Sequence, residues 1–199
     1  MTRAAFAARW AATLAAVALA GCTLGPKQNP ISLYDFGPAP AAASPSGPLA
    51  RLRATDVVAP SWLDAPGIAY RLEYDQPQRR AVYRDSRWVA SPAALFTQRL
   101  RQRLGESPQT GPGPAQDVRL LRIELDEFAQ VFSAPTTSRA VVRLRASLLR
   151  SPVETPLAQR SFVVERPAAS ADAAGGVQAL GAAADEVLSQ VLAWAASQG

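Results

Sequence analysis

Cys22 is the only cysteine in this chain of 199 residues. The rest of the chain therefore folds without a disulfide, and its stability has to come from a hydrophobic core. Apolar residues make up 48% of the sequence, which is enough to build such a core and argues against a wholly disordered chain. A chain of this length fits one domain with irregular stretches better than two domains.

The first 21 residues have the features of a secretion signal. Arg3 and Arg9 supply positive charge without any acid, and an apolar run follows at residues 10–20. A helix needs about 20 residues to cross the hydrocarbon layer of a membrane, so this run of eleven is too short to be a permanent span. We therefore predict a signal peptide at residues 1–21 that is removed from the mature protein.

The signal peptide ends in Leu19, Ala20 and Gly21, and Cys22 follows. An apolar residue, two small residues and a thiol are typical of the bacterial lipobox. The thiol forms a thioether with diacylglycerol before cleavage, and cleavage then frees the Cys22 amine for a further acyl chain such as palmitate. Two or three acyl chains make membrane attachment effectively permanent, whereas one chain holds a protein only marginally. The alternative is that Cys22 lies by chance near an ordinary cleavage site.

Behind the predicted anchor, the sequence indicates a tether at residues 22–30 and a single domain at residues 31–199. Residues 37–48 contain only Gly, Pro, Ala and Ser, a composition that cannot bury surface and is typical of a loop or linker. Residues 107–115 form a second loop that is rich in Pro and Gly.

Alternation of apolar and polar residues predicts a sheet. The pattern is clearest in residues 139–150, where apolar side chains recur at every second position. In residues 118–132 the alternation loses its phase at Phe128, which predicts a bulge near Glu127. The other segments that we predict to be strands are residues 31–36, 51–58, 68–74, 81–86 and 157–166.

Two helices complete the predicted fold. Ser91 and Pro92 mark a helix start, because a capping hydroxyl precedes a proline suited to the first turn, and Gly105 ends this helix. An apolar stripe from Val177 to Trp194 predicts the second helix; a coiled-coil seam is the alternative, but packing on a sheet fits its short length better. The predicted fold class is α+β, a mainly antiparallel sheet of about six strands with two helices packed on one face.

The chain contains no histidine, which excludes Ser-His-Asp and Cys-His nucleophile systems and the zinc sites that use histidine. Glu124 and Asp126 would share one face of a strand, so a hydrolase with two carboxylates is one hypothesis. A solvated strand face is the simpler interpretation. No phosphate-binding glycine loop or nucleophile elbow occurs. We therefore predict no enzymatic activity, no cofactor and no metal site.

The net charge of +5 falls to +3 when Arg3 and Arg9 leave with the signal peptide (5 − 2 = 3). This weak surplus suits lipid headgroups or an acidic partner better than nucleic acid. Aromatic and arginine side chains most often anchor protein partners. The candidate partner-binding residues are Trp62, Trp88, Arg87, Arg99 and Arg103. The alternatives are that the aromatics fill the ends of the core and that the arginines lie on solvated faces.

The order of these elements resembles that of a known family. The residues that carry the resemblance are Trp62, Leu63, Asp64, Pro66, Ile68, Tyr70 and Arg71, then Tyr83, Asp85, Ser86, Arg87 and Trp88, then Pro92, Leu95, Leu125, Phe128, Ser161, Phe162, Ala179, Leu180 and Ala183. With the lipobox, residues 31–194 resemble the PqiC-like auxiliary lipoproteins of ABC-type transport systems. The hairpin that ends in Ser86, Arg87 and Trp88 is the most specific part of the resemblance.

The resemblance implies a non-catalytic periplasmic domain held by its lipid anchor at the outer membrane. Its partners would be an ABC permease, the ATPase of that permease, and an MCE-domain protein that carries phospholipid or other hydrophobic molecules between membranes. Thr23 fits release to the outer membrane, because the usual inner-membrane retention signal is an Asp at this position. Inner-membrane anchoring and a homo-oligomer stay open. The main hypothesis is thus an adaptor, and the alternative is a lipid-binding shuttle or acceptor with a cavity between sheet and helices.

Overall fold

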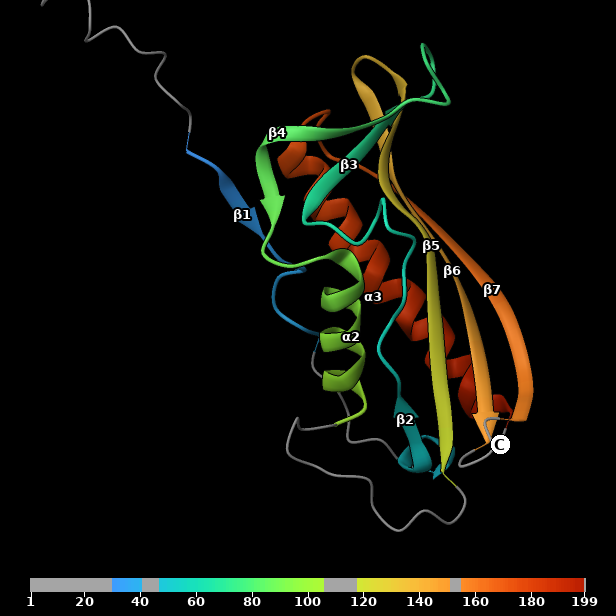
Figure 1. The fold of residues 1–199 in the computed structure, drawn as a ribbon. Helices are drawn as coiled ribbons and strands as arrows, with labels where there is room; N and C mark the ends of the chain where they lie inside the picture. Colours follow the sequence, from blue (N-terminus) through green and yellow to red (C-terminus); the bar gives the residue numbers. More distant parts are fainter. Residues whose placement is uncertain (1–29, 41–46, 106–117, 151–154, 199) are drawn as a thin grey trace, which may run out of the picture. The chain divides into compact units, whose positions relative to one another are not determined.

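The computed structural model describes residues 30–40, 47–105, 118–150 and 155–198. The predicted signal peptide, Cys22 and the loop at residues 107–115 lie outside the described residues. The chain divides into two units, Met1–Pro30 and Ile31–Gly199, and the fold described below is that of the second unit. This unit is α+β, with one sheet and two α-helices in its described part (Figure 1).

The sheet has seven strands within the described residues. Their bounds are β1 (Ser32–Tyr34), β2 (Leu52–Ala54), β3 (Gly67–Leu72), β4 (Arg80–Trp88), β5 (Arg119–Ala134), β6 (Thr137–Arg150) and β7 (Thr155–Pro167). A short 3-10 helix, η2 (Gly47–Arg51), leads into β2. The order across the sheet is β1, β4, β3, β5, β6, β7, and β2 pairs with β5.

The prediction of a mainly antiparallel sheet is wrong, because the sheet is mixed. β3 with β4, β5 with β6, and β6 with β7 are antiparallel pairs. β1 with β4, β2 with β5, and β3 with β5 are parallel pairs. Parallel neighbours need a long crossover, and the connection from β4 to β5 supplies one through helix α2 (Pro92–Arg103). Hairpin turns leave a local pattern in a sequence, whereas pairing between distant segments does not.

Strand β5 is the central element of this sheet. On one edge it pairs with β6 along most of its length, and on the other edge it pairs first with β2 and then with β3. The register with β6 skips Asp126 between Leu125 and Glu127, so Asp126 is the extra residue of a bulge. The bulge brings Phe128 back to the core side, where it is 1% exposed. The predicted bulge is thereby confirmed.

Both helices begin at capped residues. The Ser91 hydroxyl accepts a hydrogen bond from the backbone N–H of Ala94 at 3.4 Å, and Pro92 is the first residue of α2, as predicted. Helix α3 (Ala173–Ser197) begins after Asp172, whose carboxylate accepts from the backbone N–H of Gly175 at 2.8 Å. That hydrogen bond is the main reason why the pKa of Asp172 is lowered. Helix α3 packs on β6 and β7, so its apolar stripe faces a sheet, as predicted.

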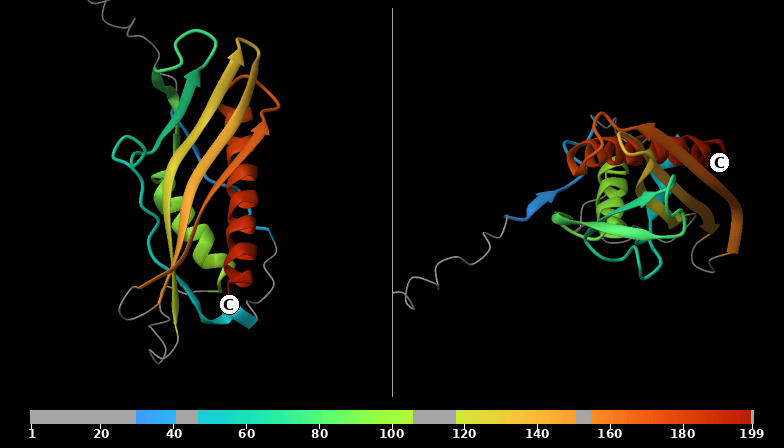
Figure 2. Two further views of the ribbon diagram at one scale, coloured as in Figure 1. Left: turned by 90° about the vertical axis from the view of Figure 1, so that its right-hand side faces the viewer. Right: turned by 90° about the horizontal axis from the view of Figure 1, so that it is seen from above.

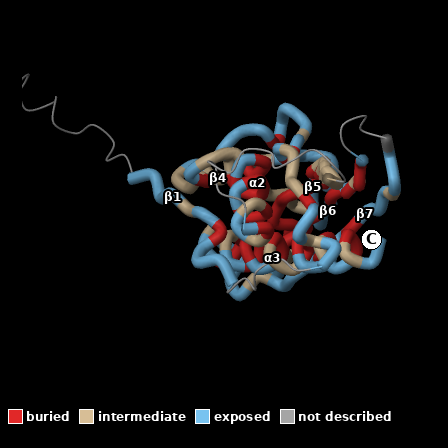
Figure 3. Tube along the Cα trace, turned by 90° about the horizontal axis from the view of Figure 1, so that it is seen from below, coloured by how far each residue is buried: buried red, intermediate tan, exposed pale blue. Residues whose placement is uncertain are grey.

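The helices lie on the same side of the sheet (Figure 2). Phe96 of α2 contacts Phe128 with a centroid distance of 5.3 Å, and Trp194 of α3 contacts Phe162 of β7 at 5.8 Å. Phe36, which follows β1, lies 5.1 Å from Phe96 and extends this aromatic cluster. Figure 3 shows that the buried stretches gather between α2, α3 and the central strands. The core is thus a filled layer between helices and sheet.

Candidate partner-binding surfaces

The exposed side chain of Trp62 packs against a cluster of charged side chains, Arg80, Glu127 and Arg71. Its side chain lies in the corner between β2 and β3 and is 43% exposed. The guanidinium carbon of Arg80 lies 3.8 Å from the centroid of the indole ring, and this guanidinium donates to both carboxylate oxygens of Glu127, at 2.6 and 2.9 Å. Arg71 donates to the same carboxylate at 2.9 Å. Because Phe128 faces the helices, the adjacent Glu127 and the charged cluster around it lie on the opposite face of the sheet.

Trp88 and Arg87 have structural surroundings. Trp88 is 1% exposed and belongs to the aromatic core. Arg87 is partly buried, and its guanidinium donates to the backbone carbonyls of Tyr83 and Ser86. The pairing of β4 with β3 is irregular in this region, so Arg87 braces the bend of β4. Neither side chain extends freely from the surface.

Arg99 and Arg103 lie one turn apart on α2, and both point to Asp185 of α3. Arg103 Nη2 is 2.8 Å and Arg99 Nη1 is 3.6 Å from the Oδ1 atom of Asp185. Arg99, whose side chain is 5% exposed, also donates to the carbonyl of Gly37 at 2.6 Å, and Arg103 donates to the hydroxyl of Ser189 at 2.7 Å. These arginines tie α2, α3 and the segment after β1 together.

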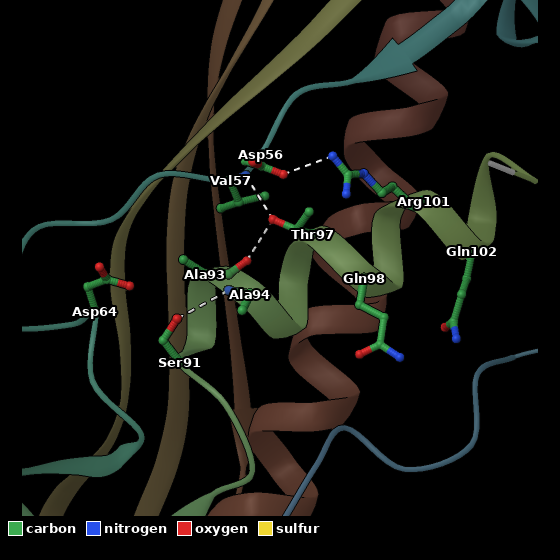
Figure 4. A pocket seen from close by; sticks show the side chains of 10 residues that line it. All are labelled: Asp56, Val57, Asp64, Ser91, Ala93, Ala94, Thr97, Gln98, Arg101 and Gln102. Atoms are coloured by element: carbon green, nitrogen blue, oxygen red, sulfur yellow. Dashed lines mark hydrogen bonds and ion pairs between the residues drawn. The ribbon is translucent and has the colours of Figure 1, made fainter. Parts of the chain in front are cut away.

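A hollow of about 610 Å³ lies beside α2 (Figure 4). Its walls are fixed, because the Thr97 hydroxyl accepts from the backbone N–H of Val57 and donates to the carbonyl of Ala93, both at 2.9 Å. Arg101 binds Asp56 across it at 2.8 Å. The residues that line this α2 hollow are Asp56, Val57, Asp64, Ser91, Ala93, Ala94, Thr97, Gln98, Arg101 and Gln102. The sequence pattern does not predict this hollow, because its helical residues have the pattern of an ordinary solvated face.

A second hollow, of about 440 Å³, lies between the β1 segment and α3. Leu33 and Val89 line it from the sheet side, and Val177 and Gly181 line it from the helix. Gly181 has no Cβ, which lets the segment after β1 cross α3 closely here, since an added Cβ would lie 3.3 Å from the carbonyl oxygen of Phe36.

The two carboxylates considered for hydrolysis do not form a site with either hollow. Glu124 lies 3.6 Å from Arg145 in a half-exposed ion pair, and Asp126 is the exposed residue of the bulge. Neither lines the α2 hollow or the second hollow. In the part of the chain that the structure describes, no three side chains of the types that bind metals gather into a group.

The space between sheet and helices is filled by side chains. Leu121, Leu144 and Leu180 are fully buried there, together with the aromatic cluster. Beside them lies a buried polar network, in which the Tyr83 hydroxyl donates to Gln130 at 2.8 Å and the Gln130 amide donates to Ser138 at 2.7 Å. Burial, followed by the charge of Asp172, raises the pKa of Tyr83 to about 12.

In its described residues the chain is thus an α+β domain with a filled core and hollows that open on its surface. A family model described as the ABC-type transport auxiliary lipoprotein component matches residues 34–192. The match extends over most of the chain, which belongs to this family. It confirms the resemblance that the sequence pattern indicated.

Solved structures share this fold. A protein from Xanthomonas campestris assigned to the DUF330 family is 22% identical with a TM-score of 0.67, over 84% of this chain and 96% of that chain. A second structure, described as an uncharacterized protein, is 14% identical with a TM-score of 0.63, over 83% of this chain and 99% of that chain. At these identities the likeness concerns the fold alone. A comparison with curated proteins finds no match.

Family membership indicates an auxiliary component of transport and a membrane-anchored lipoprotein of the cell envelope. Within the described residues, no helix combines the length and the apolar character that crossing a membrane requires.

Proposed function

We propose that this chain is a non-catalytic adaptor of an ABC-type transport system. Acyl chains on Cys22 hold it at the periplasmic face of the outer membrane, and its domain docks an MCE-domain protein that passes lipid or another hydrophobic solute between the membranes. The permease and the ATPase in the inner membrane supply the energy. The family match over residues 34–192 is the observation that carries this proposal.

The filled core supports an adaptor over a lipid shuttle. A shuttle needs a pocket of several hundred Å³ that encloses most of its ligand. Side chains such as Phe128 and Leu144 occupy the layer between sheet and helices where a lipid would lie. Both hollows are open at the surface and have polar side chains in their walls, so neither encloses an acyl chain.

The α2 hollow is the surface that we propose for docking. Its walls combine the apolar side chains of Val57 and Ala93 with the amides of Gln98 and Gln102. Interfaces of this mixed kind bury an apolar centre within a polar rim. The Thr97 hydrogen bonds hold the hollow in shape before a partner arrives, which reduces the entropy lost on binding.

Site-specific photo-crosslinking in cells that contain the transport system tests this proposal. A photoreactive residue replaces Gln98 in the α2 hollow, and the matched control replaces Gln159 on strand β7, at the far edge of the sheet. We expect the MCE-domain protein to be crosslinked from position 98 and not from position 159. Recovery of only unrelated envelope proteins from position 98, or equal yields from both positions, would contradict the proposal.

A further inference from the structure

Three exposed apolar side chains lie on or next to β1, where the domain begins. Ile31, Leu33 and Val89 are 59%, 65% and 55% exposed. The backbone N–H of Val89 donates to the carbonyl of Tyr34 at 2.8 Å, which holds it beside β1. Leu33 and Val89 line the second hollow together with Val177 of α3. We name Ile31, Leu33 and Val89 the β1 corner.

An apolar corner is unusual on an edge strand. β1 is the outermost strand at its end of the sheet, and exposed edges usually carry charged side chains that prevent association. Single exposed apolar residues need no explanation, whereas several together indicate a surface that meets another apolar medium. We therefore expect another apolar surface to cover the β1 corner.

The length of the preceding chain identifies that occupant. Ile31 follows Cys22 by nine positions, and a fully extended chain spans at most about 3.5 Å per residue, or roughly 30 Å for this segment. If Cys22 is acylated, Ile31 stays within this distance of the lipid headgroups. The membrane surface is then the apolar medium nearest to the β1 corner.

Two acidic side chains beside the corner have hydrogen-bond or ion-pair partners within the protein. Asp35 accepts a hydrogen bond from the backbone N–H of Gly37 at 2.7 Å, and Asp185 binds Arg103 at 2.8 Å. The ion pair with Arg103 offsets the charge of Asp185, whereas Asp35 keeps its negative charge at the edge of the corner. The headgroups of a zwitterionic bilayer, which carry no net charge, accommodate this carboxylate better than an anionic bilayer would.

We propose that the β1 corner inserts into the surface of the membrane that holds the acyl anchor. Ile31, Leu33 and Val89 then orient the domain, which does not swing freely on its tether. This inference rests on the lipid anchor of the proposed function, and it concerns a contact of the domain itself.

Environment-sensitive dyes on single cysteines test this contact in the full mature lipoprotein. An acylated Cys22 has no free thiol, so Leu33→Cys and Val163→Cys variants can be labelled selectively. Val163 is the matched control, because it is 50% exposed on the outer strand β7 at the opposite edge of the sheet. In phosphatidylcholine vesicles, we expect a blue-shifted emission at position 33 that brominated acyl chains quench, and a water-like emission at position 163.

Water-like emission at both positions, from protein whose intact mass includes the acyl chains, would overturn the inference and leave the proposed anchor standing. Shielding of position 33 only after an MCE-domain protein is added would overturn it in favour of a protein partner. Absence of acyl chains from the intact mass would overturn both the inference and the anchor.

Discussion

Gly176 illustrates how a single missing methyl group allows α3 to pack on the sheet. A Cβ at this position would lie 2.0 Å from Oε1 of Gln130. Gln130 is fully buried and links Tyr83 to Ser138 by hydrogen bonds. The amide therefore cannot move aside without breaking bonds in a region that water does not reach.

We predict that Gly176→Ala lowers the free energy of unfolding by about 2 kcal/mol, measured by urea denaturation. Overpacking costs about 1–3 kcal/mol and a lost buried hydrogen bond about 1 kcal/mol, while the better helix propensity of Ala returns about 1 kcal/mol. In a Gln130→Ala background the obstacle is gone, so the same substitution should be neutral or stabilising. An equal loss in both backgrounds would show that Gln130 is not the cause.

Ionisation of the Tyr83 phenol lowers the stability of the folded protein at alkaline pH. Its pKa is raised to about 12, mainly by burial, so the folded state favours the neutral phenol. This contribution is fully present below the pKa of an unfolded tyrosine, about 10, and is lost as the pH rises from there toward 12. We predict that Tyr83→Phe flattens the decline of stability over this range, although it loses the hydrogen bond to Gln130. Equally steep declines in both proteins would contradict this prediction.

The bulge at Asp126 is a property of strand β5 as an element. Deletion of Asp126 leaves Leu125 and Glu127 consecutive, and their partners on β6, Leu144 and Arg143, are already consecutive. The register with β6 therefore survives this deletion. Stability is lost only because the bend of β5 at the bulge disappears and the spacing between its pairings with β2 and β3 changes. We predict a folded protein that is destabilised by about 1–2 kcal/mol in urea denaturation, within the usual range for a single change.

Deletion of Ala129 is the control for the bulge. It removes a residue that is paired in the ladder, so Gln130 and Phe132 would turn to the opposite face and the register would slip by one residue. We expect this variant not to fold. Equal damage from both deletions would mean that Asp126 is not a simple insertion into the strand.

At the scale of elements, the sequence correctly predicted the features that depend on neighbouring residues. Ser91 and Pro92 placed the start of α2, and the phase of Phe128 placed the bulge. Arg99 was predicted to bind a partner, with a solvated helix face as the alternative, because its neighbours in the sequence show no acidic residue that it could pair with. Arg99 instead turns to Asp185, a partner on α3 that no local pattern reveals.

At the scale of the whole molecule, the mixed sheet and the two hollows depend on contacts between distant segments. The parallel pairing of β3 with β5 follows from the path through α2, and the α2 hollow follows from the approach of Val57 to Thr97. Trp88 was a candidate for partner binding because aromatic side chains often anchor partners, yet β1 and Phe36 bring it into the core. The acylation of Cys22, in contrast, is a prediction that rests on the sequence alone.

Thr23 decides, in our proposal, which membrane carries the whole molecule. The residue after an acylated cysteine is read by the sorting machinery, and an Asp there is the usual signal for retention in the inner membrane. We predict that Thr23→Asp moves the lipoprotein from the outer-membrane fraction to the inner-membrane fraction. Thr23 precedes the domain, Ile31–Gly199, so the urea denaturation of the Thr23→Asp variant should equal that of the wild type. A Thr23→Ser control should stay in the outer membrane. An unaltered distribution of the Asp variant, or a wild-type protein already in the inner-membrane fraction, would contradict anchoring at the outer membrane.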